Sequence, residues 1–252
     1  MNIEKLRENW LTEEYEATIK GWDFSHIEGK VKENELPWNY KHIIQKYLKS
    51  TDKILDIDTG GGEFLLSLNH PYELTSVTEG YAPNIALCEQ KLGRLGIEVR
   101  AMSNYARMPF ENNEFDVIIN RHGAYDAKEI YRILKPGGLF ITQQVGEDND
   151  WDLIKRLLPK AKKTYPGHNL QTQAKTFETQ GFTLLEQDEA HPSIYFYDTK
   201  ALIWFAKIIP WEFQGFTVQS AFQHLLDVEE QIKTQGFIKG TTHRFYLVAR
   251  KL

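Results

Sequence analysis

Lys53-Ile-Leu-Asp-Ile-Asp-Thr-Gly-Gly-Gly-Glu63 is the stretch that decides the fold of this chain. The apolar run Ile54–Ile57 predicts a short buried strand, and the three glycines after it predict a tight turn. A helix is then expected to open with Phe64, Leu65, Leu66 and Leu68. A strand, a glycine turn and a helix start build a nucleotide-type site, because glycine lets the backbone approach a ligand and the helix amides point at it.

Three kinds of nucleotide-binding turn share this pattern. The phosphate-gripping P-loop needs Gly-Lys-Ser/Thr after its glycines, which this stretch lacks. The dinucleotide fingerprint needs a third glycine three residues after Gly62, where Leu65 stands. The remaining pattern, Asp56-Ile-Asp-Thr-Gly-Gly-Gly62, resembles motif I of the class I S-adenosylmethionine (SAM) methyltransferases, Asp-x-Gly-x-Gly-x-Gly. Asp58 stands where that motif has its first glycine, so we expect an unusual turn there.

The length and composition are those of an ordinary globular protein. At 252 residues the chain can bury a full core, and its apolar runs are too short for a membrane span. The N-terminus lacks the basic-then-apolar pattern of a secretory signal, and the single Cys88 fits a reducing, cytoplasmic setting. The net charge of −5 argues against a broad nucleic-acid surface.

We expect a single domain over residues 1–252, with a helical N-terminal cap (1–50), a SAM-binding core (51–150) and an aromatic-rich insertion or lid (190–240). After the aromatic residues, Thr217–Gln235 has the spacing of an amphipathic helix. The aromatic side chains of the insertion are expected to form a satellite core. They either serve only as this core or also line an apolar pocket for the methyl acceptor. They are Tyr195, Phe196, Tyr197, Trp204, Phe205, Trp211, Phe213 and Phe216.

In the predicted cap, apolar residues recur at helical spacing. They are Ile3, Leu6 and Trp10, and later Ile43, Ile44, Tyr47 and Leu48. Two aromatic segments, 22–26 and 36–38, lie between these groups. Their side chains either pin the helical cap onto the sheet or close over a cofactor or substrate, and both interpretations stay open.

Strand and helix signals alternate from 54 to 145, which predicts a parallel sheet with helices on both faces. A helix that starts near Pro83 and stops at Gly96 has Cys88 on its apolar face, so this thiol is expected to pack in the core. A helix from Ala127 is expected to end in a turn at Lys135-Pro-Gly-Gly138. The strands after Ile54–Ile57 are expected at Leu74–Glu79, Ile97–Met102, Glu114–Arg121 and Leu139–Val145.

Two further strands complete a seven-stranded, mostly parallel sheet. Phe182–Glu186 follows a helix that stops at Gly181, and His243–Arg250 is the last strand. In the fold class that the resemblance implies, the last strand lies antiparallel beside the fifth. A basic cluster in and after the predicted helix 151–161 is either a solvated helix face or a contact for phosphate or RNA. It comprises Lys155, Arg156, Lys160, Lys162 and Lys163.

The resemblance extends to Ser103–Phe110 and Ile133–Ile141, and it implies where SAM binds. Glu79 lies 23 residues beyond Asp56, about the spacing at which an acid accepts from ribose hydroxyls. Asn104 stands where the family has an aspartate that meets the adenine amino group, and Tyr105 would add a backbone amide. Asp56 would orient the turn or accept from the methionine amino group. The implied cofactor-binding residues are Asp56, Asp58, Gly60, Gly61, Gly62, Glu79, Gly80, Asn104, Tyr105, Asn120 and Arg121.

None of the eight histidines forms a His-x-x-x-His or Cys-His array, so no metal site is expected. His122 follows the fourth strand, where the family presents the methyl group to its acceptor. It is the candidate catalytic residue, as a general base that is needed only if the acceptor starts protonated.

The sequence therefore predicts a SAM-dependent methyltransferase acting on a small, partly apolar molecule. Such an enzyme aligns its acceptor with an already activated methyl group and excludes water. Two alternatives stay open: methylation of RNA through the basic cluster, and a catalytically silent SAM-binding or interaction protein, in which Asp58 would disable the turn. Leu65 disfavours an NAD-dependent oxidoreductase. The acceptor and the oligomeric state are not determined by the sequence.

Overall fold

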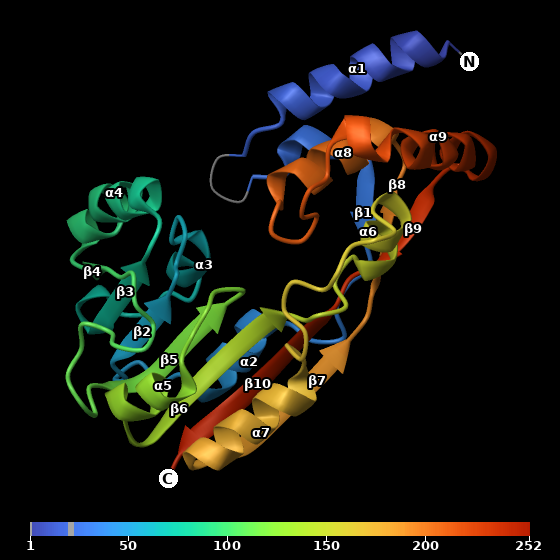
Figure 1. The fold of residues 1–252 in the computed structure, drawn as a ribbon. Helices are drawn as coiled ribbons and strands as arrows, with labels where there is room; N and C mark the ends of the chain where they lie inside the picture. The colour runs from blue at the N-terminus through green and yellow to red at the C-terminus, as the bar shows by residue number, and fades with distance from the viewer. Residues whose placement is uncertain (1, 20–22) are drawn as a thin grey trace. The chain divides into compact units, whose positions relative to one another are not determined.

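The computed structural model describes residues 2–19 and 23–252, and Figure 1 shows the path of the chain. The chain divides into two compact units, each assembled from separate segments. The first, here called the aromatic unit, comprises residues 1–36, 147–167 and 191–243. The second, here called the sheet unit, comprises residues 37–146, 168–190 and 244–252. The predicted insertion thus falls almost entirely in the aromatic unit, whereas the predicted cap is divided between the two.

The sheet unit is built on a seven-stranded sheet of order β4-β3-β2-β5-β6-β10-β7. Every pair is parallel except the two that β10 makes, antiparallel, with β6 and β7. The predicted fold class and the antiparallel last strand are confirmed. The strands are β2 (Ile54–Ile57), β3 (Thr75–Glu79), β4 (Glu98–Ala101), β5 (Phe115–Arg121), β6 (Leu134–Val145), β7 (Phe182–Ala190) and β10 (Arg244–Lys251).

Successive residues of a strand point to opposite faces, so β2 contributes to two cores. Ile54 joins a cluster with Ile44 and Leu92, and Leu55 joins another with Ile130 and Phe177. Helices α2, α3 and α4 contribute to the first cluster, and α5 and α7 to the second. The helices are α2 (Tyr40–Tyr47), α3 (Glu63–Leu66), α4 (Ala82–Lys91), α5 (Ala127–Ile133) and α7 (Leu170–Gln180), with 3₁₀ turns η2 (Tyr72–Leu74) and η3 (Gly93–Leu95).

The predicted end of the helix is confirmed, since α5 stops at Ile133, but Lys135–Gly138 lie within β6 and do not precede that strand. Leu134 pairs with Phe115, and the next paired residues are Leu139 and Val117. The extra residues of β6 form an irregularity in the ladder rather than a separate connection, and Gly137 takes a left-handed φ of 78° within it. Leu134 and Phe115 are both buried, and their pairing holds the start of β6 against β5 before the irregularity.

The prediction of a wholly helical N-terminal cap is also wrong. Helix α1 (Ile3–Glu16) and the 3₁₀ turn η1 (Ser25–Ile27) are followed by a strand, β1 (Val31–Glu33). This strand pairs antiparallel with β8 (Ser193–Phe196), a partner more than 160 residues away that local spacing cannot reveal. Trp22, in the aromatic segment 22–26, lies outside the described residues.

The aromatic side chains of the cap pack in different units. Trp10 is buried in the aromatic unit, where its ring meets Phe222 edge-on at 5.8 Å. Trp38 belongs to the sheet unit and lies 4.9 Å from the ring of Tyr246 on β10. The interpretation that aromatic residues pin the N-terminal segment onto the seven-stranded sheet therefore holds for Trp38.

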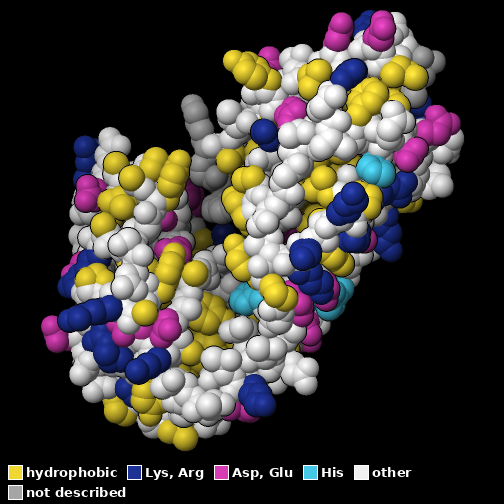
Figure 2. All heavy atoms as spheres, viewed as in Figure 1, with side chains coloured by type: hydrophobic (Ala, Val, Ile, Leu, Met, Phe, Trp, Pro, Cys, Tyr) yellow, Lys and Arg dark blue, Asp and Glu magenta, His cyan; other side chains and the backbone are white. Residues whose placement is uncertain are grey.

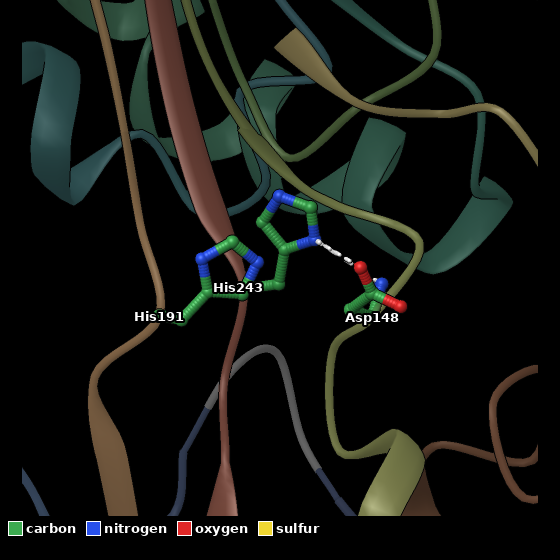
Figure 3. A group of neighbouring side chains, drawn as sticks. All are labelled: Asp148, His191 and His243. Carbon is green, nitrogen blue, oxygen red and sulfur yellow. Dashed lines mark hydrogen bonds and ion pairs between the residues drawn. The ribbon is translucent and has the colours of Figure 1, made fainter.

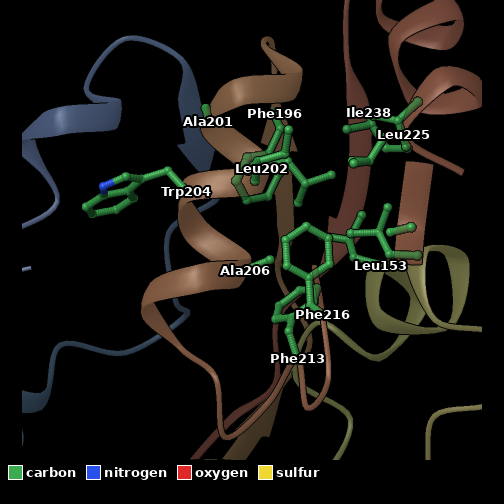
Figure 4. Packing of buried hydrophobic residues seen from close by; sticks show 14 of the residues in the cluster. Leu153, Phe196, Ala201, Leu202, Trp204, Ala206, Phe213, Phe216, Leu225 and Ile238 are labelled. Atoms are coloured by element: carbon green, nitrogen blue, oxygen red, sulfur yellow. The ribbon is translucent and has the colours of Figure 1, made fainter. Parts of the chain in front are cut away.

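The aromatic unit has its own core around a three-stranded sheet of order β1-β8-β9. Figure 4 shows Phe196, Phe213 and Phe216 within this core, together with aliphatic residues from neighbouring helices. The expected satellite core is thus present. Its remaining elements are α6 (Trp151–Leu157), α8 (Thr199–Ile208), α9 (Val218–Gln235) and β9 (Ile238–Thr241). No helix within residues 2–19 and 23–252 is long and apolar enough to cross a membrane.

Two tryptophans of the aromatic unit should respond very differently to truncation. Trp204 is 2% exposed and lies 5.2 Å from the ring of His26, whereas Trp211 is 39% exposed. We expect Trp204→Ala to lower the free energy of unfolding by about 3–5 kcal/mol, the cost of an aromatic core deletion. Trp211→Ala is the matched control and should cost below about 1 kcal/mol. Urea denaturation of both variants measures the difference, and equal losses would contradict this core.

Candidate functional site

The candidate site lies in the sheet unit, at the carboxyl ends of β2, β3 and β5. Gly60 and Gly62 take left-handed φ angles of 64° and 75°, and Gly62 caps α3. A Cβ on Gly62 would come within 2.7 Å of the Leu92 side chain. A Cβ on Gly80 would come within 2.8 Å of the Met102 carbonyl oxygen. Both positions therefore need glycine for reasons of space, in addition to the conformation that Gly62 requires.

Glu79 holds this turn in place. Its Oε2 accepts the amide of Gly60 at 2.9 Å, and its Oε1 accepts the amides of Gly80 and Tyr81 at 2.9 and 3.0 Å. The side chain is buried at the end of β3. A carboxylate has about four lone-pair positions, so it can still accept from a ligand after these three bonds. The predicted ribose acceptor is therefore also the residue that joins the glycine turn to the end of β3.

Asp56 contacts the glycine turn from the buried strand β2. It is buried at 5% exposure and accepts the Thr59 hydroxyl at 2.7 Å. Burial raises the pKa of Asp56 to about 7, against the lowering effect of Thr59 and of the Arg121 charge. The contact with Thr59 supports the prediction that Asp56 orients the glycine turn.

Asp58 is the residue that departs from the family motif. Its backbone takes the left-handed φ of 57°, the conformation that a glycine would adopt without strain. Oδ2 accepts the Tyr105 hydroxyl at 2.6 Å, whereas Oδ1 is buried and has no hydrogen-bond partner among the described residues. Burial, with a smaller contribution from the charge of Glu79, raises the pKa of Asp58 to about 6, against the lowering effect of the Tyr105 hydrogen bond. A buried oxygen without a donor is costly, so this atom is suited to a ligand that brings one.

The three carboxyl groups form one electrostatic system. The charges of Asp58 and Glu79 both raise the pKa of Asp56, and that of Glu79 raises the pKa of Asp58. Like charges in a partly desolvated site oppose ionisation, and an added positive charge would relieve the repulsion. The site is thus better suited to a cationic ligand than to an anionic one.

Helix α4 supports the turn from behind. The Cys88 thiol donates to the Gly60 carbonyl oxygen at 3.0 Å, and Lys91 Nζ donates to that of Gly61 at 2.9 Å. Burial raises the pKa of Cys88 to about 11, so the group stays a thiol at neutral pH. This agrees with the expectation that Cys88 is a packed core residue.

Asn104 and Tyr105 lie on the loop after β4. Asn104 is exposed, and its Oδ1 accepts the amide of Ala106 at 3.0 Å, as in an Asx turn. This oxygen can accept a second hydrogen bond. Tyr105 contributes its hydroxyl to Asp58, a side-chain contact that the family motif does not indicate.

Asn120 is fully buried at the end of β5, and its side chain ties three strands together. Nδ2 donates to the Ile57 carbonyl oxygen, while Oδ1 accepts from Thr142 and from Gln144. The neighbouring Arg121 is exposed, and its guanidinium lies 4.4 Å from the centre of the Phe64 ring. The contacts of Asn120 support the strand ends that carry the site.

His122 has a fixed tautomer. Trp38 Nε1 donates to Gln143 Oε1 at 2.8 Å, so the Gln143 amide nitrogen is the atom that faces His122 Nε2, at 3.1 Å. An amide nitrogen can only donate, which leaves the proton of the neutral ring on Nδ1. Desolvation and the charges of Arg244 and Arg121 lower the pKa of His122.

Several supporting side chains carry no sequence signal of their own. Tyr40 places its hydroxyl 2.9 Å from the Asn120 carbonyl oxygen and 2.8 Å from that of Ile141. Tyr40 precedes the first core strand, in a part of the chain where the sequence pattern indicates only a helix. Thr59 could have been inferred, because a hydroxyl three residues after Asp56 suits a tight turn.

The strand order, the glycine turn and the acidic strand ends define the Rossmann-like fold of the class I SAM-dependent methyltransferases. Residues 55–142 match the model of the family described as Methyltransferase domain. Over 142 residues the chain is 34% identical to a sterol 4-C-methyltransferase of Caenorhabditis elegans. This match covers 50% of this chain and 41% of that protein. The chain spans less than half the length of the curated relatives it matches.

Solved structures share the fold at low identity. A putative methyltransferase from Bacillus halodurans superposes with a TM-score of 0.58 and 16% identity, covering 84% of this chain and 98% of that one. A geranyl diphosphate C-methyltransferase from Streptomyces coelicolor has a TM-score of 0.51 and 12% identity, covering 84% and 78%. The latter structure holds Mg²⁺, geranyl diphosphate and S-adenosylhomocysteine.

Gly62 should tolerate a side chain far less well than Gly93. A Cβ at Gly62 meets Leu92 at 2.7 Å and adds strain at φ 75°, so we expect Gly62→Ala to destabilise the protein by about 1–3 kcal/mol. Gly93 has open space around its Cβ position and no left-handed φ. Gly93→Ala should therefore be neutral or stabilising by up to about 1 kcal/mol. Chemical denaturation compares the two, and an equally tolerated Gly62→Ala would contradict the packing of the turn.

Asp58 should make the ligand-free protein less stable as the pH rises. Its pKa is about 6 in the folded state and 3.8 in the reference state, so unfolding releases a proton between about pH 4 and 6. Stability falls with rising pH where the native state holds more protons. Asp58→Asn removes this titration and tolerates the left-handed backbone. Between pH 4 and 7 the wild type should lose up to about 3 kcal/mol relative to that variant. Parallel pH profiles of the two proteins would refute the assignment.

Proposed function

We propose that the protein is a SAM-dependent methyltransferase acting on a small, partly apolar molecule. The observation that carries the proposal is the buried Asp58 Oδ1, which lacks a donor beside two further carboxyl groups. The methionine part of SAM ends in an amino acid group, whose ammonium is a strong donor with a positive charge beside a carboxylate. Bound SAM also supplies an activated methyl group on a positively charged sulfonium. Both charges suit this acidic site.

Most of the predicted cofactor residues have a defined task in this proposal. The Gly60–Gly62 turn and Gly80 let the backbone approach the ligand, and Glu79 accepts from the ribose hydroxyls. Asn104 accepts from the adenine amino group beside the backbone of Tyr105. We assign the ammonium to Asp58, because its buried Oδ1 has no hydrogen-bond partner among the described residues.

The same charges argue against a dinucleotide cofactor. A pyrophosphate carries two negative charges, and Asp56, Asp58 and Glu79 would face it across the glycine turn. In dinucleotide-binding folds the pyrophosphate rests on helix amides with no such group of acids. The electrostatics therefore support the exclusion that Leu65 suggested.

His122 is a poor general base in this geometry. Its Nε2 lone pair accepts from Gln143, and nearby guanidinium groups disfavour the protonated ring. We propose instead that the Nδ1–H of the neutral ring positions an acceptor by donating a hydrogen bond to it. An acceptor of this kind would not depend on His122 to remove its proton.

A small molecule is favoured over RNA as the acceptor. A sterol and geranyl diphosphate, the compounds in the names of two of the similar proteins, both have a large apolar part. In the basic cluster, Lys163 is paired with Asp148 at 2.5 Å and with Glu147 at 3.4 Å. On the face drawn in Figure 2, basic side chains lie among acidic ones. We also propose a cytoplasmic location, on the single buried thiol of Cys88.

Calorimetric titration with SAM, S-adenosylhomocysteine and NAD tests the proposal. We expect micromolar binding of the first two ligands and no binding of NAD. Asp58→Asn should weaken SAM binding by roughly 10- to 150-fold, the scale of a hydrogen bond between charged groups. Glu73→Gln removes the same charge from an exposed position on η2 and should leave affinity unchanged.

Methylthioadenosine makes the test specific, because it shares the adenosine part but lacks the ammonium group. Its affinity should be nearly the same for the wild type and Asp58→Asn. An equal loss for both ligands would mean that the substitution damages the turn instead of removing the ammonium acceptor. Binding of NAD without SAM would overturn the proposed function.

A further inference from the structure

Three side chains of the aromatic unit converge on one point, as Figure 3 shows. Asp148, His191 and His243 each offer one ligand atom, and these atoms lie within 4.8 Å of one another. Asp148 precedes α6, His191 precedes β8 and His243 follows β9. The two histidines are 52 residues apart in sequence, so no short sequence motif predicts this cluster. The sequence-based expectation of no metal site considered only short-range arrays.

Backbone hydrogen bonds fix the three segments relative to one another. The Asp150 amide donates to the Thr241 carbonyl oxygen at 2.9 Å, and the Thr242 amide donates to that of Pro192 at 2.8 Å. The His243 amide donates to Asn149 Oδ1 at 3.1 Å. A bond of this kind thus flanks each of the three side chains, so the cluster is held by the fold before any ligand arrives.

The His243 ring presents a lone pair toward the carboxylate. Its Nδ1 accepts the backbone amide of Asp148 at 3.1 Å, which requires that nitrogen to be unprotonated. Asp148 Oδ2 lies 3.9 Å from the same nitrogen, so two electron-rich atoms face each other. The His191 ring lies 4.2 Å from the His243 ring, centre to centre. Two lone pairs that face each other repel, and a cation between them would remove this repulsion.

Lys163 orients the carboxylate without using the oxygen that faces His243. Its Nζ bonds Asp148 Oδ1 at 2.5 Å and lies 3.4 Å from Glu147 Oε2. Counting Asp148, Glu147 and Lys163, the immediate charge is −1, which favours a divalent cation over an anion. A partner that holds the second oxygen of a ligating carboxylate is common around metal sites.

We propose that Asp148, His191 and His243 bind a divalent transition metal, with zinc the best match. Two imidazoles and a carboxylate suit zinc, cobalt and nickel better than magnesium or calcium, which prefer oxygen ligands. Tetrahedral zinc bonds bring ligand atoms to about 3.4 Å, so His243 Nδ1 and Asp148 Oδ2 close by a few tenths of an ångström from 3.9 Å. The Nδ1 lone pair then passes from the Asp148 amide to the metal.

The exposures of the three residues give the metal an entry path. His243 is buried and Asp148 is half-buried, whereas His191 is exposed to solvent. Three protein ligands with one on the surface leave a coordination position for water or another small donor. The site involves none of the residues assigned to SAM, so it stands independently of the proposed function.

Zinc titration of the chelator-treated full chain, without a histidine tag, tests the site. We expect one zinc per chain by calorimetry, with a micromolar or tighter dissociation constant. Cobalt should give visible absorption bands typical of a four- or five-coordinate site. His191→Ala and Asp148→Asn should each weaken zinc binding at least tenfold. His42→Ala removes an exposed histidine of the sheet unit and should change nothing.

Thermal unfolding provides a second measurement that does not depend on the heat of binding. Saturating zinc should raise the Tm of the wild type and of His42→Ala, since a ligand that binds only the folded state stabilises it. The Tm of His191→Ala should not rise. Wild-type affinity no tighter than that of His191→Ala, or equal Tm shifts in all three proteins, would overturn the proposal.

Discussion

The carboxylate of Glu79 holds the candidate site together. It accepts three backbone amides, from Gly60, Gly80 and Tyr81, and so joins the glycine turn to the end of β3. Such charge-assisted bonds offset the desolvation of a buried charge. Because Asp58 and the start of α3 belong to the same turn, their positions depend on this one group. A ligand that reaches Glu79 meets an acceptor already oriented by the backbone, which lowers the entropic cost of binding.

That anchor brings an electrostatic cost with it. Burial raises the pKa values of Asp58 and Asp56 to about 6 and 7, and the charge of Glu79 contributes to both shifts. The ligand-free site therefore carries repulsion that a cation removes. Strain and unsatisfied groups of this kind concentrate at functional sites, where stability is lost in exchange for binding. Asp58 combines a strained backbone, a buried unpaired oxygen and a perturbed pKa in a single residue.

Local patterns in the sequence predicted the sheet unit well, because its strands alternate regularly with helices and turns along residues 54–145. Ile54–Ile57 appears with the predicted bounds, and the others differ by a few residues. What failed depends on contacts between distant segments. β1 is a strand only because β8 pairs with it, and Lys135–Gly138 stays in β6 because Leu134 pairs with Phe115. The Tyr105–Asp58 bond and the Asp148 cluster likewise join residues that no spacing rule connects.

The position of β10 between β6 and β7 has a consequence for folding during synthesis. Both neighbours are complete by residue 190, yet the strand that pairs with each of them begins at Arg244. While the ribosome adds the intervening segment, the facing edges of β6 and β7 lack their native partner. Unpaired strand edges invite association with other chains. The segment 191–243 must therefore emerge before the sheet can close, which makes rapid translation or a chaperone most valuable over that interval.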